Sequence, residues 1–478
     1  MSLNNAKAFN SQLKRVASYL EKLVSEGPFL IISHYDADGL SSAAIIANIL
    51  IKRKTSFHIK IIEQPSAEDL RLLIEKYPEY KCLILCDMGS RHRKLLEEMA
   101  VNLKLNIVIL DHHIPSAESV SSEKIHEVNP WNYGINGSTQ VSTAGITYLL
   151  AKELDKDVGE KSVHLAVIGA LGDRQDQGEK CDFLGLNKLI LKDALERKII
   201  SREINIRLFG IRRRPLHKCL EYTIEPYIPG LTGDERACID FLKRISIEPF
   251  DHEGKPRYLK DLSEDEVKTL VVELVKHMIC EGVPPQEAEK ILGYSYFINA
   301  YEKYPELYDA REFASLLNAC GRLREEWIGI LICLNKLSYY NEVLNILNKY
   351  RRILSETLKT ISEEKVPINY LNKTIVVDCF SLIDERISGA ISSILSSKPM
   401  FKGKYTLLAL IASSSKPNHV KVSFRLLKDI PKFSLGDLVS KIAKITGCEA
   451  GGHEKAAGAT IPEEKINWFL RTLERELP

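Results

Sequence analysis

The chain has 478 residues, too many for one compact core, so two or three domains are expected. Hydrophobic residues at 45% and charged residues at 27% are typical of globular proteins, and the lack of a long apolar run argues against a membrane-spanning protein. The formal charge of +2 excludes binding to nucleic acid through net charge alone, so any such surface must be a local patch.

Residues 1–24 have the apolar spacing of an amphipathic helix and lack the features of a signal peptide. The ten cysteines are scattered, several of them inside apolar runs, and none forms a CxxC pair. This usage fits reduced, buried thiols better than disulfides or a zinc knuckle. Together the two observations predict a cytoplasmic protein.

The first 175 residues alternate between short apolar runs and helical patterns. Four strands are predicted, at Pro28–Ser33, Phe57–Ile62, Lys81–Cys86 and Asn106–Leu110. Helical patterns follow the first two of them, at Leu40–Lys54 and Ala67–Tyr77. Strands that alternate with helices of this length are typical of a mostly parallel sheet covered by helices.

The rest of the chain differs in pattern. Residues from about Lys180 to Tyr350 are mostly helical, and strands return at Thr374–Cys379, Tyr405–Ile411 and His419–Arg425. Helical patterns at Asp384–Leu395 and Leu435–Thr446 lie between and after them. The predicted architecture is therefore α/β, with a parallel-sheet domain at 1–180, a helical middle insertion at 181–350 and a smaller C-terminal α/β domain at 351–478.

Acidic and imidazole side chains follow the predicted strands of the first domain. They occur as His34-x-Asp36-x-Asp38-Gly39, as Asp87, as Asp111-His112-His113 and as Asp173, which ends the apolar stretch Leu165–Leu171. Because the carboxyl ends of strands in an open α/β sheet meet at one rim, four loops are expected to bring these residues together.

Carboxylate and imidazole ligands without a thiolate suit Mn²⁺ or Mg²⁺ better than a structural zinc ion. The residues are numerous enough for two ions, which can clamp a phosphoryl group and activate a shared water. The usual signatures of a serine or cysteine nucleophile are absent from the sequence. Taken singly, each motif is more often a turn or a polar loop, but their joint occurrence favours a metal site.

In order and spacing these motifs resemble the four motifs of the DHH phosphoesterase superfamily. The run from Gly451 to Ala459 resembles the glycine-rich signature of the DHH-associated substrate-binding domain, and Asn318-Ala-Cys-Gly-Arg322 is similar to the N-A-x-G-R element of RecJ-type exonucleases. A long middle insertion resembles the archaeal RecJ-like nucleases, including those that accompany the GINS replication complex.

The resemblance implies a role for each motif residue. One ion would be held by His34, Asp36 and Asp87, and the other by Asp38, Asp87, His112 and Asp173, with Asp87 as the bridge. Asp111 would orient an imidazole, and His113 would contact the scissile phosphate. The catalytic cleft is expected between the two α/β domains.

Substrate contacts are less specific in the sequence. Gly451, Gly452, His453 and Lys455 could bind phosphate, although small residues also serve tight packing. Arg322, beside Asn318, is a candidate phosphate clamp, while Arg425 is either a cleft residue or an exposed arginine. Ser142 begins a helix whose N–H groups could bind an anion or simply be capped. A basic run, comprising Arg202, Arg207, Arg212, Arg213, Arg214 and Lys218, is either a single-strand path or a solvated face.

These features predict an Mn²⁺- or Mg²⁺-dependent exonuclease acting on single-stranded DNA, and RNA as well, in replication or repair. A phosphodiesterase or phosphatase for oligoribonucleotides or small nucleotides is an alternative. A replication scaffold that has lost the chemistry is another, but every expected ligand is present in this sequence. GINS-type replication proteins are a candidate partner of the middle domain, and no membrane partner is expected.

Overall fold

The computed structural model describes residues 3–63, 65–117, 122–224, 226–396, 405–428 and 430–478. The chain packs as two units, and both are built from separate stretches of sequence. Unit 1 comprises Met1–Asn205 and Gly293–Asn348, and unit 2 comprises Ile206–Leu292 and Lys349–Pro478. The predicted domain boundaries at residues 180 and 350 rested on changes in the sequence pattern. By packing, residues 181–205 and 293–348, which begin and end the predicted middle region, belong to unit 1.

A five-stranded parallel sheet forms the centre of unit 1, in the order β2-β1-β3-β4-β5. The strands are β1 (Phe29–His34), β2 (Phe57–Ile62), β3 (Cys82–Cys86), β4 (Asn106–Leu110) and β5 (Ile125–Val128). The four predicted strands and the parallel sheet are confirmed. The fifth strand was not predicted, because it is short and carries the polar residues His126 and Glu127.

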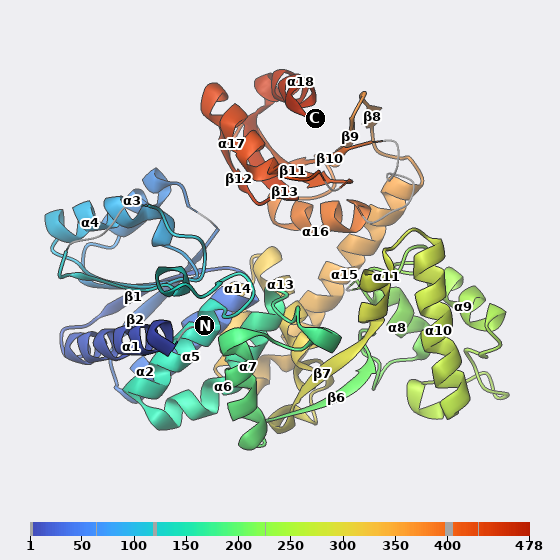
Figure 1. The fold of residues 1–478 in the computed structure, drawn as a ribbon, viewed down its shortest axis with the longest axis horizontal. Helices are drawn as coiled ribbons and strands as arrows, with labels where there is room; N and C mark the ends of the chain where they lie inside the picture. The colour runs from blue at the N-terminus through green and yellow to red at the C-terminus, as the bar shows by residue number, and fades with distance from the viewer. Residues whose placement is uncertain (1–2, 64, 118–121, 225, 397–404, 429) are drawn as a thin grey trace. The chain divides into compact units, whose positions relative to one another are not determined.

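Helices cover both faces of this sheet (Figure 1). On one face lie α3 (Ala67–Glu75) and α4 (Arg93–Asn102), which share a core with side chains such as Leu30, Leu83 and Ile107. On the other lie α1 (Leu3–Leu23), α2 (Ala37–Lys52) and α5 (Thr143–Leu154). Helix α6 (Lys156–Gly172) packs against α2 and α5. The sheet is therefore buried on both sides, as its continuous apolar strands require.

The remaining part of unit 1 brings distant sequence back to the sheet. After α7 (Gly185–Glu196), strand β6 (Ile200–Ile206) pairs with β7 (Leu292–Ile298), so the middle region is not wholly helical. Beyond β7 come α12 (Pro305–Tyr308), α13 (Ala310–Arg322), α14 (Glu326–Cys333) and the start of α15 (Tyr340–Ser362). Helix α13 packs on α6 and α14 packs on α2. The N-A-x-G-R element thereby reaches the rim of the sheet.

The first stretch of unit 2 is a helical lobe with its own hydrophobic core. It contains α8 (Leu216–Tyr222), α9 (Glu235–Arg244), α10 (Glu264–Cys280) and α11 (Pro285–Ala288). Leu220, Phe241 and Leu274 are fully or almost fully buried in that core. The lobe therefore packs as a body of its own rather than as a linker.

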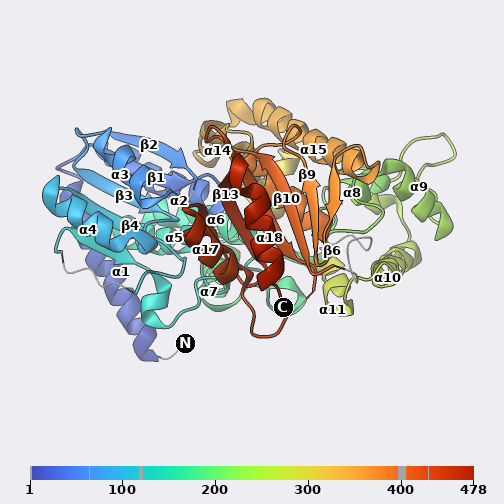
Figure 2. The ribbon, with the colours of Figure 1, turned by 90° about the horizontal axis from the view of Figure 1, so that it is seen from above.

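The C-terminal stretch of unit 2 contains a six-stranded mixed sheet in the order β12-β13-β11-β10-β9-β8. Its strands are β8 (Ile368–Tyr370), β9 (Thr374–Asp378), β10 (Leu407–Ser413), β11 (His419–Leu426), β12 (Glu449–Gly452) and β13 (Ala456–Pro462). Figure 2 shows α17 (Leu435–Thr446) and α18 (Ile466–Glu476) on one face, and α16 (Glu385–Ser396) packs on the other. The predicted second α/β domain is thus confirmed.

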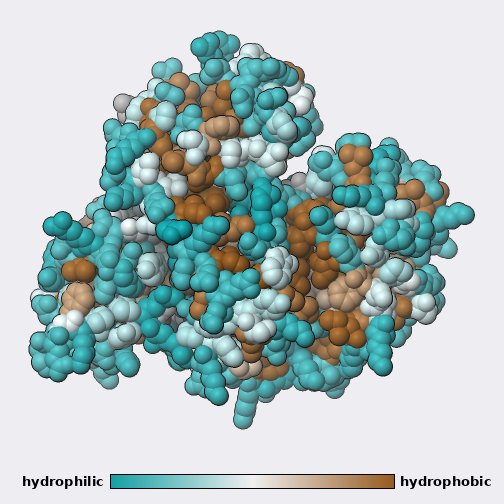
Figure 3. All heavy atoms as spheres, turned by 180° about the vertical axis from the view of Figure 1, so that it is seen from behind, coloured by the Kyte–Doolittle hydropathy of each residue, from teal (hydrophilic) through white to brown (hydrophobic). Residues whose placement is uncertain are grey.

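The surface carries mainly hydrophilic side chains, with smaller groups of hydrophobic atoms between them, on the face drawn in Figure 3. Single apolar side chains such as Trp327, Trp468 and Ile445 are about half exposed or more. In the part of the chain that the structure describes, every helix is too short or too polar to cross a bilayer.

Candidate metal centre

The first motif lies in the turn between β1 and α2. Asp36 caps the helix, and its Oδ1 accepts a hydrogen bond from the Gly39 N–H at 2.9 Å. His34 Nδ1 lies 2.9 Å from Asp36 Oδ2, so the two side chains face one another. A Cβ at Gly39 would lie 2.3 Å from the His34 carbonyl oxygen, so only glycine permits this tight turn.

The N-A-x-G-R element supports this turn from the other side. Asn318 Oδ1 accepts a hydrogen bond from the Ala37 N–H at 2.9 Å, which satisfies one of the unpaired donors at the start of α2. Gly321 lies so close to Tyr35 that a Cβ there would be 1.9 Å from the Tyr35 carbonyl oxygen. The side-chain oxygen of Asn318, predicted to contact substrate, is instead bound to the backbone of the motif.

Asp38 is fully buried, and its carboxylate is held by the start of α5. Oδ2 accepts the Thr143 N–H at 2.7 Å and Oδ1 accepts the Ala144 N–H at 2.8 Å. The partial positive charge at the helix N-terminus stabilises the carboxylate there. Ser142 caps the same helix through the Gly145 N–H at 3.2 Å. Of the two interpretations of this segment, capping is confirmed for Ser142, and the anion bound by the following N–H groups is the Asp38 carboxylate. Contact of Ser142 with substrate stays a prediction.

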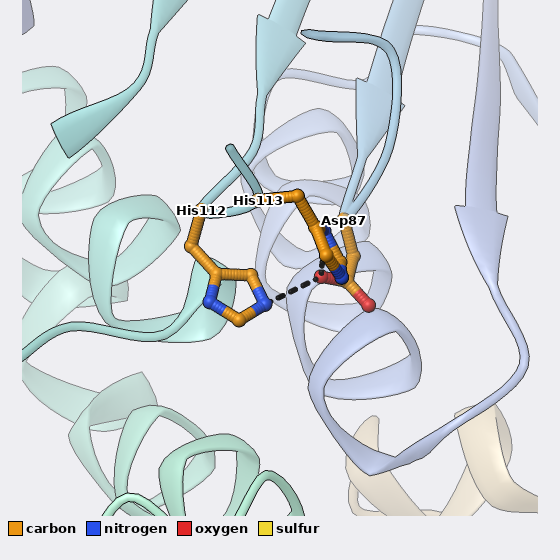
Figure 4. A group of neighbouring side chains, drawn as sticks. All are labelled: Asp87, His112 and His113. Carbon is orange, nitrogen blue, oxygen red and sulfur yellow. Dashed lines mark ion pairs between the residues drawn. The ribbon is translucent and has the colours of Figure 1, made fainter. Parts of the chain in front are cut away.

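Asp87 follows β3 and lies at the centre of the cluster (Figure 4). Its backbone adopts a left-handed conformation, with φ of 62°, which is uncommon outside glycine although asparagine and aspartate adopt it more readily than other residues. Oδ1 lies 3.3 Å from His112 Nε2 and 3.7 Å from His113 Nδ1, and Oδ2 lies 3.4 Å from His34 Nδ1. The two oxygens of this one carboxylate thus face the third motif and the first motif respectively.

His112 faces the carboxylates through one ring nitrogen and the backbone through the other. Nε2 lies 3.1 Å from Asp173 Oδ2 and 4.0 Å from Asp38 Oδ2. Nδ1 lies 2.7 Å from the Gly137 carbonyl oxygen, which can only accept a hydrogen bond. Asp173 ends helix α6, so the expectation that every motif follows a strand is wrong for the fourth one.

Asp111 does not join the ligand cluster but holds the second imidazole of its motif. Its Oδ1 lies 2.9 Å from His113 Nδ1, and its Oδ2 accepts the Ser90 N–H at 3.0 Å. The imidazole that Asp111 orients is thus that of His113, while His112 uses the Gly137 carbonyl. Ser90 in turn donates from its hydroxyl to Glu127 at 2.6 Å, so a buried network supports the pair.

Three groups of side chains each bring potential ligand atoms within 4.8 Å of one another. They are His34 with Asp36 and Asp87, Asp38 with His112 and Asp173, and Asp87 with His112 and His113. The first group has the residues predicted for one ion, and the second has those predicted for the other except Asp87, whose Oδ1 lies 3.3 Å from His112 Nε2. Sequence reasoning missed the supporting residues Thr143 and Gly137, which no metal-ligand pattern marks.

The charges of the cluster suit cations. Four carboxylates converge here, and within the described residues they form ion pairs with histidines alone, with no Lys or Arg. Buried His34 Nδ1 and Asp87 Oδ2 also lack a hydrogen-bond partner in the described part of the chain. Such concentrated negative charge is stable only if protons or cations balance it. The donor set of carboxylates and imidazoles fits two divalent ions.

The ionisation of the cluster reflects the same crowding. Burial, together with the charges of Asp173 and Asp87, raises the pKa of Asp38 well above its ordinary value. Burial lowers the pKa of His112, but its contacts with Asp173 and Asp87 outweigh burial and raise that pKa. With no cation present, protons are therefore retained in the cluster, and binding of a metal ion would release them.

The predicted substrate residues of unit 2 are placed differently from expectation. The Arg425 guanidinium donates to Ser393 Oγ at 3.1 Å and to the Gly389 carbonyl at 3.0 Å, so it binds α16 rather than ending a strand in solvent. Gly452 packs against α17, where a Cβ at Gly436 would lie 2.5 Å from the Gly452 carbonyl carbon. Tight packing therefore accounts for this glycine.

Other positions of the glycine-rich run remain open to a ligand. A Cβ at Gly451 would meet no atom of the described residues within 4 Å, and the side chain of His453 is exposed, as is that of Lys455. The His453 N–H, however, donates to the Ala456 carbonyl at 2.7 Å. Contact of these residues and of Arg322 with substrate stays a prediction.

Part of the basic run of the middle region packs on aromatic rings. The Arg214 guanidinium lies 5.7 Å from the centre of the Phe209 ring and 5.6 Å from the centre of the Tyr222 ring. Lys218 forms ion pairs with Glu221 and Glu235, each at 2.8 Å. These cations stabilise the helical lobe through cation–π and ionic contacts. A nucleic-acid role for the run stays a prediction.

Comparison with known proteins identifies the family. The model of the DHH family N-terminal domain matches residues 28–172, that of the DHH-CID domain matches 208–292 and that of the DHHA1 domain matches 371–477. The chain belongs to the DHH superfamily. An uncharacterized protein of Methanocaldococcus jannaschii is 29% identical over 469 residues, which cover 95% of this chain and 94% of that protein.

Solved structures share the fold of this DHH protein. RecJ of Thermus thermophilus in complex with Mn²⁺ matches 98% of this chain with a TM-score of 0.57 and 16% identity. This chain spans about half of that RecJ, 55% of its length. CDC45 of Entamoeba histolytica matches with a TM-score of 0.66 and 12% identity, over 98% of both chains. The predicted RecJ-like fold is confirmed, while identities this low establish the fold alone.

Proposed function

We propose that this protein is a metal-dependent phosphodiesterase that removes nucleotides from an end of single-stranded DNA, single-stranded RNA or both. The observation that carries the proposal is the convergence of six metal-ligand residues, from three turns and the end of α6, around Asp87. These six are His34, Asp36, Asp38, Asp87, His112 and Asp173. A fold that had lost its chemistry would have no reason to keep four carboxylates so close together, because their mutual repulsion destabilises the protein without bound cations.

Two Mn²⁺ or Mg²⁺ ions would be held by the two groups that flank Asp87. His34, Asp36 and Asp87 would hold one ion, and Asp38, His112 and Asp173, again with Asp87, would hold the other. Such a pair of ions supplies Lewis-acid activation of water and of the scissile phosphate. RecJ of Thermus thermophilus has been crystallised with Mn²⁺ and with Mg²⁺, which supports this choice of metal.

The remaining motif residues would act on the phosphate. Burial lowers the pKa of His113, but its hydrogen bond to Asp111 and the charge of Asp87 outweigh burial and raise it. An imidazolium held by Asp111 through Nδ1 leaves its Nε2–H to donate to a phosphate oxygen or to a leaving group. His113 thus neutralises charge at the scissile phosphate, and Asp111 fixes its orientation.

A scaffold without hydrolytic activity is the second candidate. The observation that favours it is the similarity of the fold to CDC45, which extends over 98% of both chains. A third candidate, a phosphodiesterase for oligoribonucleotides or small nucleotides, uses the same chemistry on shorter substrates. The complete set of ligands favours catalysis over the scaffold, and the long middle insertion favours long substrates over short ones.

A time course on long single strands tests the proposal. DNA and RNA oligonucleotides labelled at the 5′ or the 3′ end are incubated with Mn²⁺ or with EDTA, beside a dinucleotide. We expect stepwise loss from one end of the long strands with Mn²⁺ and none with EDTA. Cleavage of the dinucleotide alone would favour the small-nucleotide candidate, and no cleavage of any substrate would favour the scaffold.

Matched aspartate variants separate the site from the rest of the protein. Asp87→Asn keeps the shape of the side chain but removes its charge, and we expect loss of activity by at least about 10³-fold. Asp265→Asn is the control, because that side chain is 94% exposed and pairs only with Lys268 among the described residues. Activity that survived in Asp87→Asn would contradict the metal mechanism.

Partners of the middle lobe form part of the same proposal. The DHH-CID model covers residues 208–292, which pack as a separate helical lobe, and the fold resembles CDC45 over its whole length. We therefore propose GINS-type replication proteins as partners of this lobe. Co-migration of the full chain with purified GINS in gel filtration would support the partnership, and separate elution at micromolar concentrations would contradict it.

A further inference from the structure

We propose that two buried amide side chains, Gln175 and Asn187, are positioning residues that fix the imidazole of His112 for metal binding. Neither residue can ligate a metal strongly, and neither belongs to the motifs of the sequence. The inference rests on the proposed metal function and adds to it a determinant of affinity at one of the two ion sites, that of Asp38, His112 and Asp173.

The amides form a chain that ends at the histidine. Gln175 is completely buried, and its Nε2 donates to the Gly137 carbonyl at 2.9 Å while lying 3.3 Å from His112 Nδ1. Asn187 is 3% exposed and donates from Nδ2 to Gln175 Oε1 at 2.7 Å. Its Oδ1 accepts the Ser142 N–H at 3.4 Å. The chain thus links the start of α5, the first turn of α7 and the segment after α6 to one carbonyl.

That carbonyl decides which nitrogen of His112 faces the carboxylates. The Gly137 oxygen accepts from Nδ1 at 2.7 Å, so Nδ1 carries a hydrogen, and Nε2 is the nitrogen that faces Asp173, Asp87 and Asp38 and is left to bind an ion. A neutral imidazole binds a metal ion through its unprotonated nitrogen, and the hydrogen bond at the other nitrogen sets its orientation. The position of the Gly137 carbonyl is therefore a determinant of metal affinity.

Gln175 holds the carbonyl in place, and Asn187 sets the orientation of Gln175. If the Gln175 amide were rotated by half a turn, its oxygen would face the Gly137 oxygen, and two acceptors would repel. The donor from Asn187 to Gln175 Oε1 opposes that rotation. Gly137 also packs so closely on the backbone of His112 that a Cβ there would lie 2.0 Å from the His112 carbonyl oxygen, so only glycine fits at this position.

Burial of these amides argues for a positional role. An unpaired buried amide destabilises a protein, so an apolar pair would be the simpler solution for packing alone. Here each amide both donates and accepts, and the chain connects three segments to the carbonyl that His112 contacts. The amides therefore fix the position of the Gly137 carbonyl that contacts His112, in addition to filling space in the core.

Titration of the metal-free full chain with Mn²⁺ tests this role, with free Mn²⁺ followed by electron paramagnetic resonance. We expect wild type to bind two ions. Gln175→Met removes the donor at similar length, and we expect about 10–100-fold weaker binding at one site with the other unchanged. Gln177→Met is the matched control, because Gln177 is exposed and, among the described residues, bonds only the nearby Arg174 carbonyl, at 3.1 Å.

A second readout reports the histidine directly. In ¹⁵N spectra of histidine-labelled protein loaded with Mg²⁺, which is diamagnetic, we expect one tautomer of His112, protonated at Nδ1, and a mixture of tautomers in Gln175→Met. Asn187→Ser removes the donor that orients Gln175, and we expect the same change in direction. It also serves as the test if Gln175→Met fails to fold, as judged by circular dichroism.

The outcomes distinguish this inference from the proposed function. Wild type that binds no Mn²⁺ would refute the metal function itself, before any variant is considered. Wild type that binds two ions, beside variants that bind both with unchanged affinity and keep the same His112 tautomer, would overturn the role of the amides and leave the metal function intact.

Discussion

Substitution of Gly169 by alanine is a sharp test of the cluster, because this glycine faces Asp38. Gly169 lies on α6 one turn before Asp173. A Cβ there would lie 2.3 Å from Asp38 Oδ1 and 2.6 Å from the Ala144 Cβ. The carboxylate must therefore move and give up its hydrogen bond from the Ala144 N–H, which is 2.8 Å long.

The expected loss of stability is the sum of opposing effects. Loss of a charge-assisted hydrogen bond costs about 1.5–3 kcal/mol, and overpacking costs about 1–3 kcal/mol. Alanine favours the helix over glycine by about 1 kcal/mol. The net destabilisation of unit 1 is therefore about 1.5–5 kcal/mol. Since Asp38 is a proposed ligand, we also expect Mn²⁺ binding to weaken at the site shared with His112.

Urea unfolding measures the first effect if the fluorescence comes from unit 1 alone. Trp131 and Trp327 belong to unit 1 and Trp468 to unit 2, so a Trp468→Phe background gives that selectivity. Gly389→Ala is the control for a glycine-to-alanine change within a helix, because among the described residues its Cβ would meet only Arg425 Nη2, at 3.7 Å. Gly389 lies in unit 2, so this variant is measured with Trp468 retained. Unchanged stability and Mn²⁺ affinity in Gly169→Ala would refute the close contact with Asp38.

Three further outcomes are expected. Addition of Mn²⁺ at about 100 times the Kd of each site should stabilise unit 1 by about 2.7 kcal/mol for each ion bound, about 5 kcal/mol for two, relative to protein in EDTA, and equal melting temperatures would contradict ion binding. Burial lowers the pKa of His164 to about 4, so neutral His164 contributes to the stability of unit 1 above pH 6.5, and this contribution is lost as the pH falls. Between pH 6.5 and 5 the free energy of unfolding of unit 1 should fall by about 1.5 kcal/mol more in wild type than in a His164→Gln variant, as measured by urea unfolding. Asp111→Asn should lower kcat by about 10²–10⁴-fold through His113 and leave Mn²⁺ affinity within about 10-fold, whereas loss of both ions would make Asp111 a ligand.

Local patterns in the sequence determined the sheet of unit 1 and most of the ligand set. Continuous apolar runs such as Cys82–Cys86 are buried on both faces of a parallel sheet, so they were recognisable without tertiary information. Asp87 and Asp111 follow such runs directly, and strand ends share one rim. Strand β5 escaped prediction because Ile125–Val128 is short and only half apolar.

Only the tertiary structure decided what supports the ligands. The apolar stretch Leu165–Leu171 fits a buried helix as well as a strand, and packing against α2 and α5 makes it the end of α6. Asn318 accepts a hydrogen bond from Ala37, 281 positions away in the sequence. The role of the Gln175 amide could not be predicted because it depends on contacts with Gly137 and His112 that only folding creates. Hydrogen-bond partners so far apart leave no periodic or local signature, so chain folding alone reveals them.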